Sequence, residues 1–215
     1  MASIMKTVSA FSRERAVVDR ERTAGSYDVA PYFMSKCVAE IPVTSAFPLL
    51  FSAVVFPMTG LAGGLPGFAR FAAASTLEAA TASALGLAVG AVAPSPEVAN
   101  ALAPAMMLSN IVFGGLFVSA DNVPSYLRLL PKASLVRHCF QGLCINEFSA
   151  GIEFEASRPS DVKDGAEVLE RFGLQGSFAG TCAKQAKLCC FYNYAAFVLL
   201  RNNKPEFAAM QPPQE

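Results

Sequence analysis

Hydrophobic residues along this chain are gathered into long stretches that carry few or no charges. Four such stretches lie at about residues 39–58, 68–93, 98–118 and 188–200. A helix of about 20 apolar residues spans the hydrocarbon core of a bilayer, because each residue advances it by about 1.5 Å. The pattern predicts an all-α integral membrane protein with about four transmembrane helices. Residues 119–187 mix charged and apolar positions and predict a large external loop containing short helices.

The third stretch, Val98 to Val118, is apolar but interrupted by polar residues. The interruptions are Asn100, Pro104, Ser109, Asn110 and the pair Gly114-Gly115. A polar side chain within the membrane is costly in lipid and usually faces protein or water. We therefore expect this helix to line a transport path rather than to serve as a lipid-facing anchor.

The first stretch contains three prolines, and a tight loop is expected after it. Pro42 suits the first turn of a helix, whereas Pro48 and Pro57 should kink it. Residues 60–67 are rich in glycine and predict a loop. The last stretch, Leu188 to Leu200, crosses only if its helix begins near residue 179, with the neighbouring lysines extending to the surface.

The second stretch carries small residues at four-residue intervals. Ala82, Gly86 and Gly90 would let another backbone approach closely, so we expect a helix-packing face there. Glu78 lies in the same stretch. It is interpreted as a carboxylate near the membrane face or bonded to nearby Ser and Thr; the alternative is a buried carboxylate that gates substrate or protons. The short connection at residues 94–97 makes the second and third stretches an antiparallel hairpin.

The first 36 residues are rich in charge, with Val8, Phe11 and Val18 roughly on one helical face. They predict either a solvated helix or a helix along the cytoplasmic membrane surface that could receive force from a partner. Basic residues near the span ends favour a multi-pass topology with both termini in the cytoplasm. The expected segments are a cytoplasmic connecting or coupling helix (1–36), three transmembrane helices (37–118), an external loop subdomain (119–187), the last transmembrane helix (188–205) and a tail (206–215).

Composition agrees with this membrane interpretation. Of 215 residues, 53% are hydrophobic and 16% charged, against about 45–50% and about 25% in soluble domains. The formal net charge is +0, so nothing suggests a nucleic-acid partner. The six cysteines are too few and too scattered for a disulfide scaffold, and the pairing of Cys139 with Cys144 stays open. The N-terminal segment lacks the apolar run of a signal peptide.

An enzyme site or a metal site is not expected. His138 and Cys139 are adjacent, and such residues on a helix point to different faces; no third group is evident to orient them for nucleophilic chemistry. The C-x-x-C and H-x-x-x-H patterns of metal sites are absent.

Several motifs, in this order and at this spacing, resemble the ABCG, or White-type, ATP-binding cassette half-transporters over roughly residues 11–205. They are Glu14-Arg15-x-x-x-x-Arg20-Glu21; Tyr27, Tyr32 and Lys36 with Glu40-Ile41-Pro42; Met58-Thr59-Gly60-Leu61; Phe113-Gly114-Gly115-Leu116-Phe117; and Asn146-Glu147-Phe148 with Gly151.

The resemblance implies the membrane half of an ATP-driven exporter, with the four spans as the family's third to sixth helices. The resemblance implies four residues that couple to the ATPase domain: Glu14, Arg15, Arg20 and Glu21. Implied to face the substrate cavity are Pro104, Leu108 and Ile111, to which we add the polar Asn110. Leu116 and Phe117 would close the outer end, as an apolar constriction blocks water and ions.

The chain departs from the family pattern in lacking a G-x-x-x-x-G-K-[ST] phosphate loop. No cofactor is therefore expected in this chain, with ATP and Mg on an ATPase domain that it lacks together with the first two membrane helices. It is expected to be a fragment, a truncated product or a separately encoded piece. The implied partners are an ABC nucleotide-binding domain, a second half-transporter and membrane lipids.

The expected function is half of a translocation path for apolar or amphipathic molecules. The alternative is a truncated, non-transporting membrane protein that pairs with full-length transporters through its Gly86 and Gly90 face and regulates them.

Overall fold

The computed structural model describes residues 2–23, 27–115, 129–149, 164–174 and 176–202, which form eight helices. The long helices are α1 (Ala2–Thr23), α2 (Val29–Thr59), α3 (Gly64–Val92), α4 (Pro96–Val112) and α8 (Phe178–Asn202). The short ones are α5 (Leu129–Ala133), α6 (Leu135–Phe148) and α7 (Gly165–Arg171). The all-α prediction is confirmed for the described residues.

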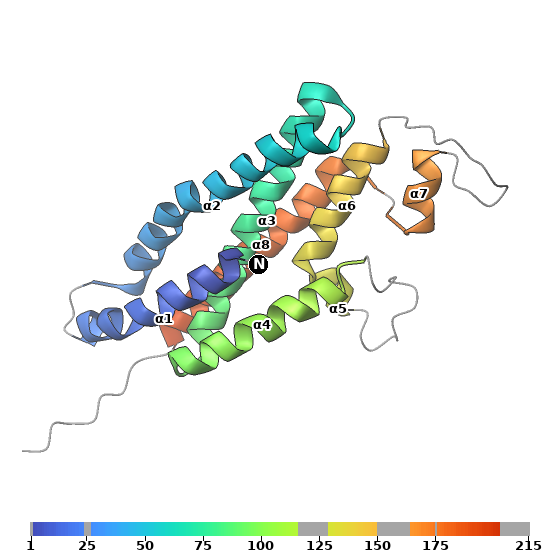
Figure 1. Ribbon diagram of the computed structural model, residues 1–215. Coiled ribbons are helices and arrows are strands. Elements are labelled where there is room, and N and C mark those ends of the chain that lie inside the picture. The colour runs from blue at the N-terminus through green and yellow to red at the C-terminus, as the bar shows by residue number, and fades with distance from the viewer. Residues whose placement is uncertain (1, 24–26, 116–128, 150–163, 175, 203–215) are drawn as a thin grey trace, which may run out of the picture.

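Helix α3 is the centre of the bundle. It packs against α8, α1, α2, α6 and α4, and the other long helices surround it in Figure 1. Every residue from Thr81 to Ala91 is buried. This segment is rich in alanine and glycine, whose small side chains allow close approach on several sides at once.

Helix α1 lies parallel to α3 and covers its glycine face. A Cβ built on Gly86 would lie 3.1 Å from the Ile4 carbonyl oxygen, and one on Gly90 would lie 2.7 Å from the Phe11 ring. Val8 and Phe11 are consequently buried, at 0% and 2% exposure. The sequence predicted a solvated helix or one lying on the membrane surface; instead α3 covers this face, because its glycines leave room for the α1 backbone.

Helix α2 is longer than the apolar stretch that predicted it. The Asp28 side chain accepts a hydrogen bond from the Val29 N–H at its start, and Gly60 ends it in the left-handed conformation, with φ 65°. All three prolines lie inside this one helix. The Ser52 hydroxyl donates to the Pro48 carbonyl oxygen at 2.7 Å, the usual contact of a helical serine with the carbonyl four residues before it.

The connections follow local chemistry but shift two predicted boundaries. Helix α3 begins at Gly64, inside the predicted loop, because Pro66 is tolerated in a first helical turn. The Ser95 hydroxyl caps α4 by accepting from the Val98 N–H at 3.4 Å. Helix α4 ends at Val112, short of the predicted end at residue 118. The backbone turns soon after it, at Gly115 with φ 94°.

Among the described residues, α2 and α3 are the helices long and apolar enough to cross a bilayer. Helix α8 begins at Phe178, as its spanning would require, and Lys184 and Lys187 are exposed on it. The count of four spans stays a prediction. The predicted short helices of the loop region are present as α5, α6 and α7.

Candidate functional site

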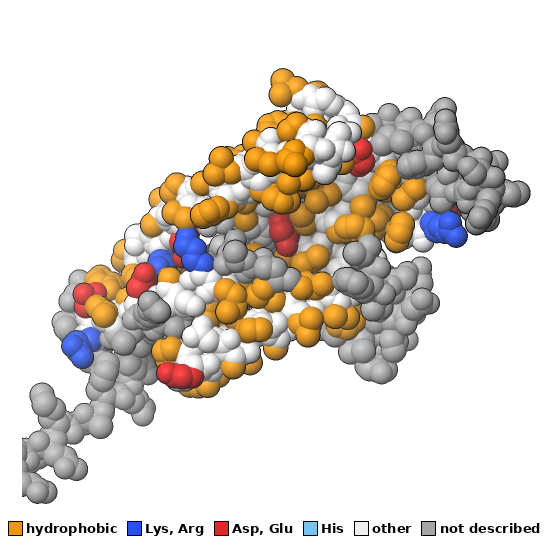
Figure 2. Space-filling view, viewed as in Figure 1, with side chains coloured by type: hydrophobic (Ala, Val, Ile, Leu, Met, Phe, Trp, Pro, Cys, Tyr) orange, Lys and Arg blue, Asp and Glu red, His pale blue; other side chains and the backbone are white. Residues whose placement is uncertain are grey.

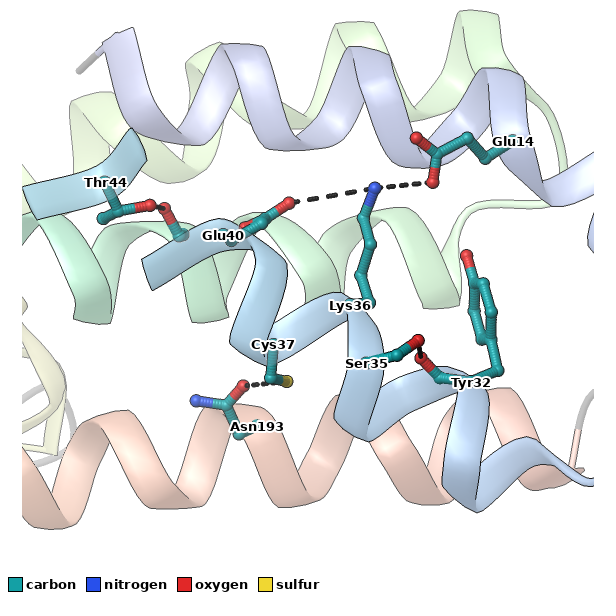
Figure 3. A network of polar contacts seen from close by, with 9 residues as sticks. Glu14, Tyr32, Ser35, Lys36, Cys37, Glu40, Thr44 and Asn193 are labelled. Atoms are coloured by element: carbon teal, nitrogen blue, oxygen red, sulfur yellow. Dashed lines mark hydrogen bonds and ion pairs between the residues drawn. The ribbon is translucent and has the colours of Figure 1, made fainter. Parts of the chain in front are cut away.

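The charged helix α1 is joined to α2 by an ion pair. Lys36 Nζ lies 2.5 Å from Glu14 Oε2 and 4.0 Å from Glu40 Oε1, one helical turn further along α2. Figure 3 shows the lysine between the two carboxylates. The Lys36 side chain is only 14% exposed, whereas that of Glu14 is 47% exposed. A charge pair that is largely shielded from water on one side is screened less than a surface pair.

The same stretch of α2 makes polar contacts with two further helices. The Thr44 and Ser83 hydroxyl oxygens lie 3.5 Å apart, between α2 and α3. The Cys37 thiol donates to Asn193 Oδ1 of α8 at 3.6 Å. These contacts, also drawn in Figure 3, make the first half of α2 the point where α1, α3 and α8 are linked by polar groups.

The predicted coupling residues are placed in part. Besides Glu14, Glu21 accepts a hydrogen bond from the Tyr27 hydroxyl at 2.6 Å, which links the end of α1 to the residues just before α2. Arg20 is exposed on α1. The side chain of Arg15 lies outside the described part of the chain. Lys36 was not among the coupling residues predicted from the sequence, because no local pattern shows that it pairs with a residue on a different helix.

The predicted cavity residues do not gather in one pocket of this chain. Pro104 and Leu108 lie on the outer face of α4, where Leu108 is 62% exposed, and Ile111 is half-buried. A cavity of about 470 Å³ lies between α2, α3, α4 and α6, and Asn110 is the predicted residue that lines it. Leu116 and Phe117, predicted as the outer gate, lie outside the described residues.

Both asparagines of α4 accept a hydrogen bond from another helix. Asn110 Oδ1 accepts from the Leu135 N–H at 3.1 Å, and the Asn110 carbonyl oxygen accepts from the Ser134 hydroxyl at 2.9 Å. Asn100 Oδ1 accepts from the Ser9 hydroxyl of α1 at 3.3 Å. Their amides therefore tie α4 to the start of α6 and to α1. The structure places Asn110 at the cavity edge as an anchor of α6.

Apolar surface dominates the outside of α2 and α4. Phe47 is 71% exposed and Leu50 65% exposed. On the face shown in Figure 2, hydrophobic side chains cover much of both helices, and several charged side chains gather where α1 and α2 meet. Such a surface is stable against lipid or against another apolar protein face.

Glu78 and His138 each have a polar partner, and Cys139 is buried. Glu78 Oε2 accepts from Gln185 Nε2 of α8 at 2.5 Å, a partner other than the nearby Ser and Thr expected from sequence. His138 Nε2 lies 3.0 Å from the Lys132 carbonyl oxygen, and burial lowers the pKa of His138. Burial raises the pKa of the Cys139 thiol, which disfavours the nucleophilic thiolate.

The cysteines are free thiols, Cys139 and Cys144 included. In the part of the chain that the structure describes, no group of His, Cys, Asp and Glu side chains could hold a metal ion.

Comparison with known proteins identifies the family. Residues 1–148 match the ABC-2 type transporter family. The chain is 47% identical to ABC transporter G family member 7 of Arabidopsis thaliana over 98% of its own length, which is 29% of that relative. It is 31% identical to Protein white of Drosophila melanogaster over 68% of its length, which is 21% of that relative.

A third relative is the ABC transporter ATP-binding protein/permease wht-1 of Caenorhabditis elegans, 30% identical over 66% of this chain and 21% of the relative. The chain thus spans less than a third of the length of these relatives. The chain belongs to the ABC-2 type transporter family, among its G-type, White-like members, and corresponds to part of their membrane region.

Proposed function

We propose that this chain forms part of the membrane domain of an ATP-driven exporter and supplies half of a translocation path for apolar or amphipathic molecules. Membership of the ABC-2 type transporter family is the observation that carries the proposal. The apolar outer faces of α2 and α4 fit a membrane position. Apolar ligand classes are favoured because the exposed residues of α4 are mostly Ala, Leu, Met, Pro and Val, with few polar anchors.

ATP hydrolysis would take place on a nucleotide-binding domain outside this sequence. The sequence holds no phosphate loop of the Walker type, and the name of the wht-1 relative combines an ATP-binding protein with a permease. ATP and Mg would bind that domain. Its motion would reach the membrane through α1, where Glu14 is tied to Lys36 of α2.

The substrate path would lie between this chain and a second half-transporter. Pro104 and Leu108 are exposed on the outer face of α4, so they can contribute to a cavity only if another protein surface or lipid faces them. Two such halves rocking about a shared cavity would give alternating access. Both termini would lie in the cytoplasm.

Charge reversal tests the coupling role of α1. In the complete ATP-coupled transporter, we expect Glu14→Lys and Lys36→Glu each to lower transport by about two- to fivefold, the range expected for loss of one partly exposed ion pair. Membrane insertion should be unchanged. The double variant restores opposite charges and should recover transport. Radiolabelled substrate uptake into inverted vesicles measures the effect, and Lys132→Glu, an exposed lysine of α5, is the matched control.

Arg20 offers a second variant on the exposed surface of α1. If Arg20→Glu and both single reversals transport as well as the unaltered protein, α1 does not carry the motion. The regulator alternative makes a different prediction: the purified chain would accompany a full-length relative and lower its vanadate-sensitive ATPase. Its glycine face, through which that pairing was expected, is covered here by α1 of the same chain.

A further inference from the structure

Two motifs far apart in the sequence meet at the α2–α3 turn. The Ala62 N–H donates to the Glu147 carboxylate, at 3.0 Å to Oε1 and 3.1 Å to Oε2. Asn146 Nδ2 donates to the Gly67 carbonyl oxygen at 3.1 Å. Asn146 and Glu147 lie in the last turn of α6, so one short segment of α6 holds both sides of the turn.

The turn is built to present these groups. Gly60, Gly63 and Gly64 have φ values of 65°, 91° and 54°, a conformation that residues with a Cβ adopt only with strain. A Cβ on Gly67 would lie 2.6 Å from the Ala62 carbonyl oxygen, so the turn and the start of α3 approach closely. The glycines therefore allow the turn to adopt the conformation in which the Ala62 N–H meets Glu147 and the Gly67 carbonyl oxygen meets Asn146.

The other side of the motif is equally close-packed. A Cβ on Gly165, the first residue of α7, would clash with the Phe148 carbonyl oxygen. Asn146, Glu147 and Phe148 thus contact the α2–α3 turn on one side and α7 on the other. We call the three hydrogen bonds from Ala62 and Asn146 the turn clasp.

The turn clasp lies at the opposite end of α2 from the Glu14–Lys36 ion pair. Lys36 and Gly60 are separated along α2 by about 36 Å at about 1.5 Å per residue. One end of α2 is held to α1 by the Glu14–Lys36 pair, and the turn at its other end is held to α6. Helix α2 runs between these two attachments, and α3 follows directly after the second.

We propose that Asn146 and Glu147 are positioning residues that make α6 and the α2–α3 hairpin move as one body, so that motion delivered at α1 reaches the loop region. This inference rests on the proposed transport function. The carboxylate suits the task because a charged acceptor bonds an N–H more strongly than a neutral one and can follow it with either oxygen.

Hydrogen exchange tests the clasp without any transport measurement. In lipid nanodiscs, the amide of Ala62 should exchange about tenfold faster or more in Glu147→Ala, because its charged acceptor is lost. Glu147→Gln keeps one neutral acceptor and should give a smaller increase. Glu170→Ala on α7, an exposed acidic residue, is the matched control and should change nothing. Exchange at residues 60–67 that is unchanged in both Glu147 variants would overturn the clasp.

If Glu147→Ala unfolds the protein more widely, exchange will be faster throughout α3 and α8. In that case Glu147→Gln is the variant that tests the turn clasp. Transport then tests the coupling. Per folded molecule, Glu147→Gln should lower the turnover of substrate by about threefold or more, the size of a typical coupling change, and leave KM within twofold. A turnover equal to that of the unaltered protein would refute coupling. If the unaltered complete transporter shows no ATP-dependent transport, the proposed function fails, and exchange alone judges the clasp.

Discussion

Helices α2 and α3 are both long and apolar, yet the protein uses them in opposite ways. Helix α3 is buried on nearly all sides over its second half, whereas large side chains of α2, such as Phe47 and Leu50, are exposed. The difference follows from side-chain size. Alanine and glycine let neighbouring backbones approach α3, while the bulkier residues of α2 keep neighbours away and provide surface for lipid.

The largest effect is expected from filling the small-residue face of α3. Gly86→Leu would place a side chain where even a Cβ lies 3.1 Å from the Ile4 carbonyl oxygen and from Thr7 Cβ. Overpacking of this kind costs about 1–3 kcal/mol. We expect a lower midpoint of thermal unfolding in mild detergent. An unaltered midpoint would mean that α1 does not pack on α3 in the membrane.

An intermediate effect is expected from the polar contact between α3 and α8. Gln185→Leu removes the donor to the Glu78 carboxylate. Loss of a hydrogen bond between membrane helices costs about 0.6–1.7 kcal/mol. Thermal unfolding should show the loss, and Lys184→Leu, at an exposed neighbouring position, should not. Equal midpoints for the two variants would contradict a stabilising role for this contact.

The smallest effect is expected on the exposed side of α2. Leu50→Ala removes a side chain that is 65% exposed, and substitutions at such positions usually change stability by less than about 0.5 kcal/mol. Its unfolding midpoint should match that of the unaltered protein. A loss as large as that of Gly86→Leu would show that a partner covers this face, and the contrast between α2 and α3 would then be wrong.

Much of the fold could be predicted from local patterns. The apolar stretches predicted the long helices, and the helical spacing of Val8, Phe11 and Val18 identified the buried face of α1. The boundaries shifted where one residue outweighed the pattern. Helix α3 begins early because a first turn accepts Pro66, and α4 ends early at its glycine pair.

The candidate site was less predictable, because its contacts join distant parts of the chain. Glu14 and Lys36 are each part of a recognisable motif, yet nothing local indicates that they pair. Asn110 was expected to face a substrate, but its Oδ1 accepts from the Leu135 N–H, one of the backbone donors that the start of α6 leaves without an intrahelical partner. Buried polar groups take whichever partner the tertiary arrangement brings within reach.

By itself, the sequence determined that the chain forms apolar helices, where its turns lie, and which face of α3 is small enough to be packed against. Only the tertiary structure decided what fills each position: α1 on the glycine face, Gln185 beside Glu78, and Glu147 on the α2–α3 turn. Helix formation depends on neighbours within a few residues, whereas these pairings depend on how whole helices lie against one another.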